Sequence, residues 1–557
     1  MSETLFKKHE IVLRRAIEAI ENREFWTPYS EIPSTKIYGE GAREIGENAF
    51  KSYLNKPFQL GQPHNGNFIG SEHSPFGFDL GITYPEIDPN DLINYSLKAA
   101  EEWAKTSIEK RLGICIEVLD RLNNRSFELG HAGMHTTGQG FAMAFQANGP
   151  HANDRGLEAL AYAYKAMDEV PTSTYWEKPQ GKRAPLEIDK FFTIRPKGIG
   201  LVIGCNTFPA WNGYGGIFAN LATANTVIIK PHPNAILPLA ILVKTLRQVL
   251  FEEGLDPNTA LIAFDTLDKP ISKELARRAE IKLIDFTGGS KFGNWLEYNA
   301  TQANVYTEKS GVNNIIIDST NNYKGMCRNI AFSLSLYSGQ MCTTPQNIFV
   351  PKEGILTDVG PRSYLEVSED IGGAIGSLLE DDATASEILG GIVNLENIDR
   401  LESASLLGDV EIPSRTIEHK FYPNARIHTP LLLKVDSVDI DTYSQELFGP
   451  IGFIIGAKNT NESMEIVLAL LKEKGGITFG CYSSDEKILN EMEDVAFKGG
   501  VSLSENLTAG LFINQSAGFS DYHATGANPA ANATLTDAAF IAGRFNIITV
   551  RRHAKKP

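Results

Sequence analysis

The middle of the chain alternates short, unbroken apolar runs with longer amphipathic segments. The apolar runs predict strands over residues 191–194, 198–204, 226–230, 260–264 and 282–286, and the segments between them predict helices over 211–224, 237–252 and 272–279. Strands that are apolar on both faces and alternate with helices are typical of parallel βαβ units. The pattern therefore predicts a parallel sheet covered on both faces, with a nucleotide site at the carboxyl ends of its strands.

A second alternating block follows the first, and helical periodicity precedes both. Strands are predicted over 314–317, 346–350, 431–435, 451–455 and 476–482, with a helix over 323–337. Apolar residues recur every three or four positions from residue 91, and further helices are predicted over 5–21 and 156–167. A chain of 557 residues exceeds what one hydrophobic core supports, so we expect two α/β lobes with smaller appendages.

Charge, hydropathy and cysteine usage exclude several function classes. A net charge of −16 disfavours a broad surface for nucleic acid or anionic membranes. The longest apolar runs are too short to cross a bilayer, and the first ten residues lack the apolar core of a secretory signal, so we expect a cytoplasmic protein. The five cysteines are far apart and never form a Cys-x-x-Cys pair, which favours reduced thiols and predicts no metal site.

Two residues are candidates for covalent chemistry. Cys342 follows Gly339-Gln340-Met341, and Glu308 lies in the segment Tyr306-Thr307-Glu308-Lys309-Ser310-Gly311. A thiol nucleophile needs a group that promotes thiolate formation and a second group that resolves the covalent adduct. Taken alone, a small buried hydrophobe explains the cysteine better, and a solvated side chain explains the glutamate better.

A glycine-rich turn closes the predicted strand over 282–286 and opens a helix. Glycines at 288, 289 and 293 with Ser290 would let the backbone approach a phosphate at the helix N-terminus. Glycine turns between strands and helices are common, and this one does not match the G-x-G-x-x-G fingerprint. By itself it is a weak indication of a cofactor loop.

Taken in order along the chain, six motifs resemble the aldehyde dehydrogenase superfamily. They are Asn206-Thr207-Phe208-Pro209, the strand over 226–230 ending in Lys230-Pro231, the turn over 286–293, Glu308, the segment Gly339 to Cys342, and Glu446-Leu447-Phe448-Gly449-Pro450. The resemblance covers about residues 91–544.

This resemblance implies an α/β fold with four parts. A Rossmann-like NAD(P)-binding lobe would span residues 86–307, interrupted near 180–196 by a small β-hairpin that serves oligomerisation. An α/β catalytic lobe would span 308–542, an N-terminal arm over 1–85 would pack on the body, and residues 543–557 would form a C-terminal oligomerisation strand. A homodimer or homotetramer is the implied assembly.

The resemblance also implies a role for each motif residue. Cys342 would attack an aldehyde, the Asn206 amide would hold the oxyanion, and Glu308 would activate water. Because relatives that transfer the acyl group to coenzyme A usually lack this carboxylate, a free acid is the expected product. The implied cofactor-binding residues are Lys230, Pro231, His232, Gly288, Gly289, Ser290, Gly293, Glu446 and Phe448.

Cofactor choice is indicated by a departure from the family pattern. Many NAD-preferring members have a glutamate three residues after the lysine, whereas this chain has Pro233. The missing carboxylate removes repulsion toward a 2′-phosphate, and His232 or Lys230 would attract one. The sequence therefore favours NADP while leaving NAD open.

Within the superfamily, the chain is most similar to the PaaN type of phenylacetic acid degradation protein. The similarity lies in segments 25–29, 36–40, 147–152 and 523–529. It implies a small-molecule aldehyde substrate, formed by ring opening of a phenylacetate derivative linked to coenzyme A. A general aldehyde dehydrogenase of another pathway is the alternative.

A second interpretation is an enzyme of a different class that would use the same cysteine, Cys342. A cysteine-dependent hydrolase of esters or thioesters would pair Cys342 with His419, His428 or His523 as the base and would need no nicotinamide. A non-catalytic relative is disfavoured, because Cys342, Glu308 and Asn206 are all present.

Overall fold

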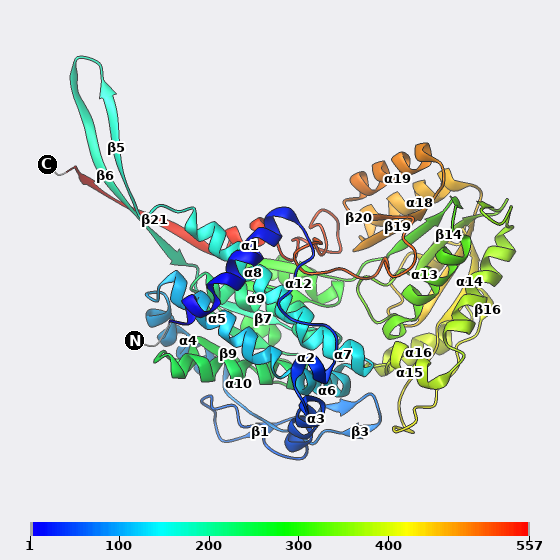
Figure 1. Ribbon diagram of the computed structural model, residues 1–557, viewed down its shortest axis with the longest axis horizontal. Helices are drawn as coiled ribbons and strands as arrows, with labels where there is room; N and C mark the ends of the chain where they lie inside the picture. The colour runs from blue at the N-terminus through cyan, green and yellow to red at the C-terminus, as the bar shows by residue number, and fades with distance from the viewer. Residues whose placement is uncertain (1–3, 555–557) are drawn as a thin grey trace.

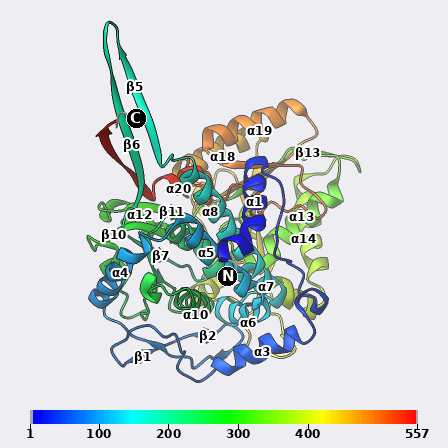
Figure 2. The ribbon, with the colours of Figure 1, turned by 60° about the vertical axis from the view of Figure 1, so that its left-hand side comes forward.

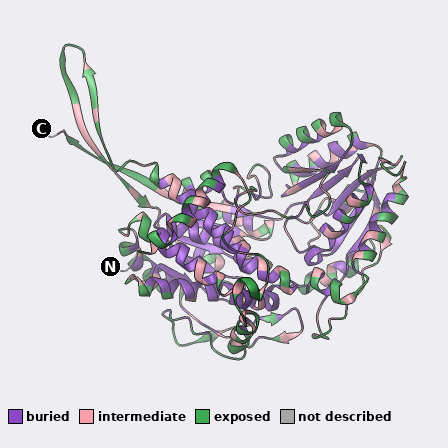
Figure 3. Ribbon diagram, in the orientation of Figure 1, coloured by how far each residue is buried: buried purple, intermediate pink, exposed green. Residues whose placement is uncertain are grey.

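In the computed structural model, which describes residues 4–554, two α/β lobes lie side by side and a long β-hairpin projects from one of them (Figure 1). Each lobe is built on its own sheet, and the apolar interior of each is buried (Figure 3). The predicted α/β fold class is confirmed.

The first lobe contains a five-stranded parallel sheet in the order β11-β10-β7-β8-β9. Its strands are β7 (Ile199–Ile203), β8 (Thr226–Lys230), β9 (Ala260–Ile262), β10 (Ile281–Thr287) and β11 (Asn304–Glu308). β7, β8 and β9 are buried along their whole length, as continuous apolar runs predict. Because the strands are parallel, their carboxyl ends meet at one edge of the sheet.

Helices enclose this sheet and form the largest apolar core. They are α4 (Pro89–Trp103), α5 (Ile108–Asn123), α6 (Ser126–Thr137), α7 (Phe141–Asn148), α8 (Pro150–Asp168), α9 (Pro209–Ala222), α10 (Leu237–Glu252), α11 (Ser272–Ala276), α12 (Ser290–Asn299) and the 3-10 turn η1 (Pro257–Thr259). The helix predicted over 237–252 matches α10, whereas α6 and α7 were not predicted.

The second lobe contains a seven-stranded sheet in the order β16-β17-β18-β14-β12-β19-β20, parallel except for β16. Its strands are β12 (Asn314–Ile317), β14 (Asn347–Pro351), β16 (Asp409–Ile412), β17 (Leu431–Asp436), β18 (Ile451–Ala457), β19 (Thr478–Tyr482) and β20 (Ser502–Glu505). Its helices are α13 (Tyr323–Ser335), η2 (Leu336–Gly339), α14 (Tyr364–Leu378), α15 (Asp382–Leu389), α16 (Leu395–Ala404), α17 (Ile440–Tyr443), α18 (Thr460–Glu473) and α19 (Glu486–Gly499). The short strands β13 (Ser319–Thr320) and β15 (Leu356–Thr357) pair with each other.

The N-terminal segment lies on the first lobe. Its elements are α1 (Leu5–Asn22), α2 (Thr35–Tyr38), α3 (Ala42–Tyr53) and the two-residue strands β1 (Phe68–Ile69), β2 (His73–Ser74), β3 (Phe78–Asp79) and β4 (Tyr84–Pro85). Glu72 is buried and accepts hydrogen bonds from the backbone N–H groups of Ile236 (2.6 Å) and Leu237 (3.0 Å). A segment of the arm therefore caps the N-terminus of α10.

A three-stranded antiparallel sheet, β21-β6-β5, stands clear of the body (Figures 1 and 2). β5 (Ser173–Gln180) and β6 (Arg183–Pro196) form the hairpin, and β21 (Phe545–His553) follows the short helix α20 (Ala538–Ala542) and pairs with β6. Exposed apolar side chains on it include Tyr175, Leu186, Phe191, Ile547 and Val550. The end of the predicted C-terminal strand segment, residues 555–557, lies outside the described residues.

Among residues 4–554, none of the helices combines the length and the apolar character that a membrane span requires.

Candidate active site

A cleft of about 770 Å³ opens at the carboxyl edge of the five-stranded sheet. Residues at or just after the ends of all five strands line it, and so do residues of the second lobe. Nine of the residues that the sequence nominated line this cleft together: Asn206, Lys230, His232, Gly288, Gly289, Glu308, Cys342, Glu446 and Phe448. Pro231, Ser290 and Gly293 are not among the lining residues.

Cys342 lies in a loop whose shape is fixed on both sides. Before it, η2 contains two residues with positive φ, Tyr337 (54°) and Ser338 (50°), and Gly339 follows at 66°. A Cβ at Gly339 would lie 2.3 Å from the Gly449 carbonyl oxygen, so the close approach requires glycine. After it, the Asn313 amide donates to the carbonyl oxygens of Cys342 (2.7 Å) and Thr344 (2.9 Å).

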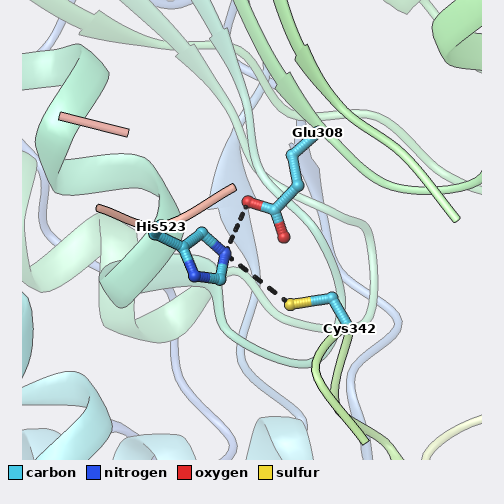
Figure 4. Close-up of side chains that lie close together, drawn as sticks. All are labelled: Glu308, Cys342 and His523. Carbon is cyan, nitrogen blue, oxygen red and sulfur yellow. Dashed lines mark hydrogen bonds and ion pairs between the residues drawn. The ribbon is translucent and has the colours of Figure 1, made fainter. Parts of the chain in front are cut away.

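Three reactive side chains meet at this loop (Figure 4). Nε2 of His523 lies 3.1 Å from Oε2 of Glu308 and 3.8 Å from Sγ of Cys342. Glu308 is the last residue of β11, whereas His523 comes from the irregular segment that returns from the second lobe to the first. Thus one imidazole nitrogen faces both the predicted nucleophile and the predicted base.

Burial and charge act differently on the two acidic groups. Burial raises the pKa of the Cys342 thiol well above its ordinary value, and the nearby Glu308 carboxylate adds to that rise. Burial also acts to raise the pKa of Glu308, but His523, Cys342 and Arg155 together outweigh it and leave that pKa lowered. At neutral pH Glu308 is therefore ionised and the isolated thiol is protonated.

Two asparagines line the cleft beside these groups. Nδ2 of Asn212, on α9, donates to Oε2 of Glu308 at 3.1 Å and so fixes the carboxylate. Asn206 lies after β7, and its side-chain oxygen is buried without a partner among the described residues. Asn206 thus lines the same cleft as Cys342, with hydrogen-bonding capacity to spare.

Lys230 is the last residue of β8 and is buried. Its Nζ lies 2.6 Å from Oδ1 of Asp265 and donates to the Pro231 carbonyl at 2.6 Å. Burial lowers the pKa of Lys230, against the attraction of Asp265. Burial lowers the pKa of the neighbouring His232 to about 4, so this ring is neutral at pH 7.

The glycine turn ends at the N-terminus of α12, where the Ser290 backbone N–H donates to the Ser310 hydroxyl at 3.3 Å. Gly289 is the N-cap of α12 and supplies no side-chain cap, and a Cβ built on it would meet nothing within 4 Å. Ser290 is not among the residues that line the cleft, and its hydroxyl donates to the Ser310 carbonyl at 3.2 Å. Gly293 is needed for packing, because a Cβ there would lie 2.5 Å from Cγ of Lys309.

Glu446 and Phe448 line the cleft from the second lobe. Burial raises the pKa of Glu446 to about 7, against the effects of Ser310 and Arg400. The Arg400 guanidinium donates to the Phe448 carbonyl at 2.7 Å, which fixes the turn that bears both residues.

The other two histidines considered as bases lie elsewhere. The His419 ring packs in an aromatic cluster, with centroids 5.5 Å from Phe76 and 4.9 Å from Tyr422. His428 bridges to Thr416 through its backbone. Of the three, His523 alone contacts Cys342 in the described part of the chain.

Sequence reasoning missed Asn212, Asp265 and Asn313, and it named His523 only as the base of a hydrolase. Asn212 lies six residues after Asn206 and Asp265 follows a predicted strand, so each carried a local signal. The ligand atoms of Glu308, Cys342 and His523 lie within 4.8 Å of one another. Nε2 of His523 already contacts Oε2 of Glu308 at 3.1 Å, and we assign no metal ligands here.

Comparison with known proteins places the chain in a family. The family model described as "Aldehyde dehydrogenase family" matches residues 84–492. The crystal structure of an NAD-dependent aldehyde dehydrogenase from Burkholderia multivorans is 50% identical, with 100% of both chains covered and a TM-score of 0.98. A 1-pyrroline-5-carboxylate dehydrogenase from Thermus with bound NAD is 17% identical, covering 95% of this chain and 99% of that one, with a TM-score of 0.72.

A curated relative agrees with these matches. The 1-pyrroline-5-carboxylate dehydrogenase of Oceanobacillus iheyensis is 24% identical over 431 residues, which cover 74% of this chain and 77% of that protein. The family model covers well over half of the chain, and its boundaries enclose the Glu308 and Cys342 motifs. The chain therefore belongs to the aldehyde dehydrogenase family.

Proposed function

We propose that this protein oxidises an aldehyde to the free carboxylic acid with NAD(P), using Cys342 as the nucleophile and Glu308 as the general base. The observation that carries the proposal is the single cleft that Cys342, Glu308 and Asn206 share with Lys230 and Glu446. This chemistry requires a nucleophile, a base and a polar cofactor groove in one place, whereas a non-catalytic relative would need none of them.

The cleft suits a dinucleotide. The N-terminus of α12, whose N-cap Gly289 has no side chain, would offer positive dipole to a pyrophosphate, and open space at Gly289 leaves room for it. Lys230 would bind the adenine-side ribose, Glu446 the nicotinamide-side ribose, and Phe448 would pack beside the ring. The bound nicotinamide would accept the hydride.

The protein residues would perform the remaining steps. The Cys342 thiolate would attack the aldehyde carbon, while the Asn206 amide and the Cys342 backbone N–H hold the oxyanion. After the substrate carbon is oxidised, Cys342 would carry an acyl group as a thioester. Glu308, ionised and held by Asn212, would take a proton from the water that hydrolyses this thioester.

Cofactor preference follows from charge. Lys230 is paired with Asp265, and His232 is neutral at pH 7, so little positive charge is free for a 2′-phosphate. The relative of 50% identity is named as NAD-dependent. We therefore propose NAD as the first cofactor to test, and the sequence-based preference for NADP stays a prediction.

For the substrate, we propose the ring-opened semialdehyde of phenylacetyl-CoA catabolism. The support is the similarity of segments 25–29, 36–40, 147–152 and 523–529 to the PaaN type. The last of these segments contains His523, which contacts Cys342. The substrate would enter as a small molecule linked to coenzyme A.

Assembly and location belong to the same proposal. The exposed apolar side chains of β5, β6 and β21 would be covered by a second copy of the chain in a homodimer or homotetramer. The five cysteines are free thiols, which supports a reducing compartment such as the cytoplasm.

A cysteine hydrolase is the second candidate, because Nε2 of His523 lies 3.8 Å from Cys342 Sγ. The deciding experiment supplies aliphatic, aromatic and CoA-linked semialdehydes with NAD or NADP and follows the absorbance of the reduced cofactor. Cofactor reduction with release of free acid supports the dehydrogenase. Ester cleavage by cofactor-free protein, without any cofactor reduction, would overturn it in favour of the hydrolase.

A further inference from the structure

We propose that His523 is the base that takes the proton from the Cys342 thiol, so that the enzyme's nucleophile is a thiolate paired with an imidazolium. This inference rests on the proposed use of Cys342 as the nucleophile. It assigns a fourth catalytic residue, distant in sequence from Cys342, Glu308 and Asn206.

The need for such a base follows from the surroundings of the sulfur. Cys342 is half-buried at the cleft, and the carboxylates of Glu308 and Glu446 and the second thiol, Cys205, disfavour a negative charge on it. Without a cationic neighbour, little thiolate would exist near pH 7. Of the side chains that contact the sulfur among residues 4–554, His523 supplies a nitrogen that can become cationic.

The geometry favours proton transfer to this nitrogen. A neutral ring that carries its hydrogen on Nδ1 directs the Nε2 lone pair at both Sγ and the Glu308 carboxylate. A proton placed on Nε2 would lie between two electron-rich groups, which attract a positive charge. The S–H bond breaks, an Nε2–H bond forms, and the new N–H lies 3.1 Å from Oε2 of Glu308 and 3.8 Å from the thiolate. No other reactant is needed.

The surroundings hold the ring in this position. The Trp211 ring meets the imidazole edge-to-face with centroids 4.7 Å apart, and the buried Arg155 guanidinium lies 4.7 Å from the Trp211 ring. The backbone of His523 pairs with Leu535 in both directions, at 3.2 Å and 2.9 Å. The imidazole is only 3% exposed, so bulk water does not compete for the proton.

The arrangement also assigns an order to the two bases. Once the thiol proton is on Nε2, Glu308 faces a cation and is a weaker base. Glu308 becomes effective toward water only after that proton has left His523. Shared use of one nitrogen would therefore keep thiolate formation and thioester hydrolysis from occurring together.

The test measures thiolate formation without aldehyde or cofactor. Iodoacetamide alkylation of the full-length enzyme is followed against pH by mass spectrometry of the peptide that contains Cys342. His523→Gln keeps an N–H that can reach Glu308 but has no basic nitrogen, so we expect alkylation at pH 7 to slow by about tenfold or more. The matched control, His428→Gln, should react like the wild type.

Equal alkylation profiles for His523→Gln and the wild type would overturn the proposal, provided that both bind NAD. If the variant does not fold, the wild-type profile decides. A reactive step below the ordinary thiol pKa of about 8.5 supports the imidazolium pair, and a single step at or above that value overturns it. Because the assay involves no oxidation, a failed dehydrogenase assay with a low-pH alkylation step would sink the proposed function and leave this inference intact.

Discussion

The two sides of Cys342 are built on different principles. Toward the cleft the surroundings are glycines, free backbone groups and half-buried polar side chains, with room for a large ligand. Behind the sulfur, His523 and Arg155 are buried and meet through the Trp211 ring. The comparison indicates that one side is open for binding, whereas the other is fixed in advance for proton transfer.

Removing the Cys342 sulfur should have the largest effect, because it should abolish catalysis and leave cofactor binding in the cleft unchanged. Cys342→Ala should lower aldehyde oxidation by roughly 10⁴-fold or more, because no other group forms the acyl intermediate. NAD binding, measured by calorimetry, should persist, since the cofactor groove does not depend on the thiol. Cys205→Ala, a second thiol that lines the cleft, is the control and should retain most activity. Comparable losses in both variants would contradict the assignment of Cys342.

Glu308→Gln should affect one step of the reaction only. Loss of the general base should lower steady turnover by roughly 10²- to 10⁴-fold. A first burst of reduced cofactor should remain, because acyl formation precedes the use of the base. Stopped-flow absorbance separates the two phases. A steady rate equal to that of the wild type would remove Glu308 from its role.

Arg155→Leu tests the buried side of the site, behind the Cys342 sulfur. The substitution removes the 2.9 Å partner of Glu158, which is also fully buried and keeps Arg23 at 3.3 Å, and breaking a buried pair costs about 3 kcal/mol. The melting temperature should fall, and Cys342 alkylation at pH 7 should slow as Trp211 and His523 lose support. Arg15→Leu, which removes exposed pairs with Glu18 and Glu24, should lower the melting temperature far less. Equal melting temperatures would show that the buried pair is dispensable.

Glu446 gives the open side a pH dependence. Since burial raises its pKa to about 7, the carboxyl is ionised above that pH and protonated below it. An ionised carboxylate accepts ribose hydroxyl hydrogen bonds more strongly. NAD affinity should therefore fall by about tenfold between pH 8 and pH 6 in the wild type. Glu446→Gln should bind NAD with one affinity across this range, and a matching decline in that variant would assign the effect to another group.

The smallest effect is expected at His232. Because burial lowers its pKa to about 4, the ring is neutral at pH 7 and adds no charge for a 2′-phosphate. His232→Gln should change the ratio of NADP to NAD efficiency by less than about threefold. Steady-state kinetics with both cofactors measures this ratio. A large loss specific to NADP would restore the sequence-based argument for that cofactor.

The two sides also differ in how far sequence predicts them. Buried strands such as β8 and β12 are continuous apolar runs, so the pattern predicts them with correct ends. α6 is buried on nearly every face, so its sequence lacks the polar stripe that marks an amphipathic helix. β5 is exposed along most of its length, so it lacks the alternation of apolar and polar residues that marks a half-buried strand. The cleft residues lie in short motifs at strand ends and were found from those motifs.

His523 could not be placed in this way. It lies 181 residues from Cys342 in an irregular segment, and its contact with Glu308 depends on the return of the chain from the second lobe to the first. Local pattern says nothing about such a return. The six motifs of the family resemblance do not include this histidine, and the similarity of segment 523–529 to the PaaN type assigned it no role.

The crossing between the lobes has a mechanical consequence. Residues 309–313 alone join β11 to β12, and they connect Glu308 directly to Asn313, whose amide holds the Cys342 loop. Backbone hydrogen bonds from the Lys309 N–H to the Ala530 carbonyl and from the Val312 N–H to the Gly475 carbonyl hold this short connection in place. A hinge motion at this segment would move the Cys342 sulfur away from Glu308 and His523. We therefore expect the two lobes to keep a fixed relative position, and ligands to bind and leave through loop movement alone.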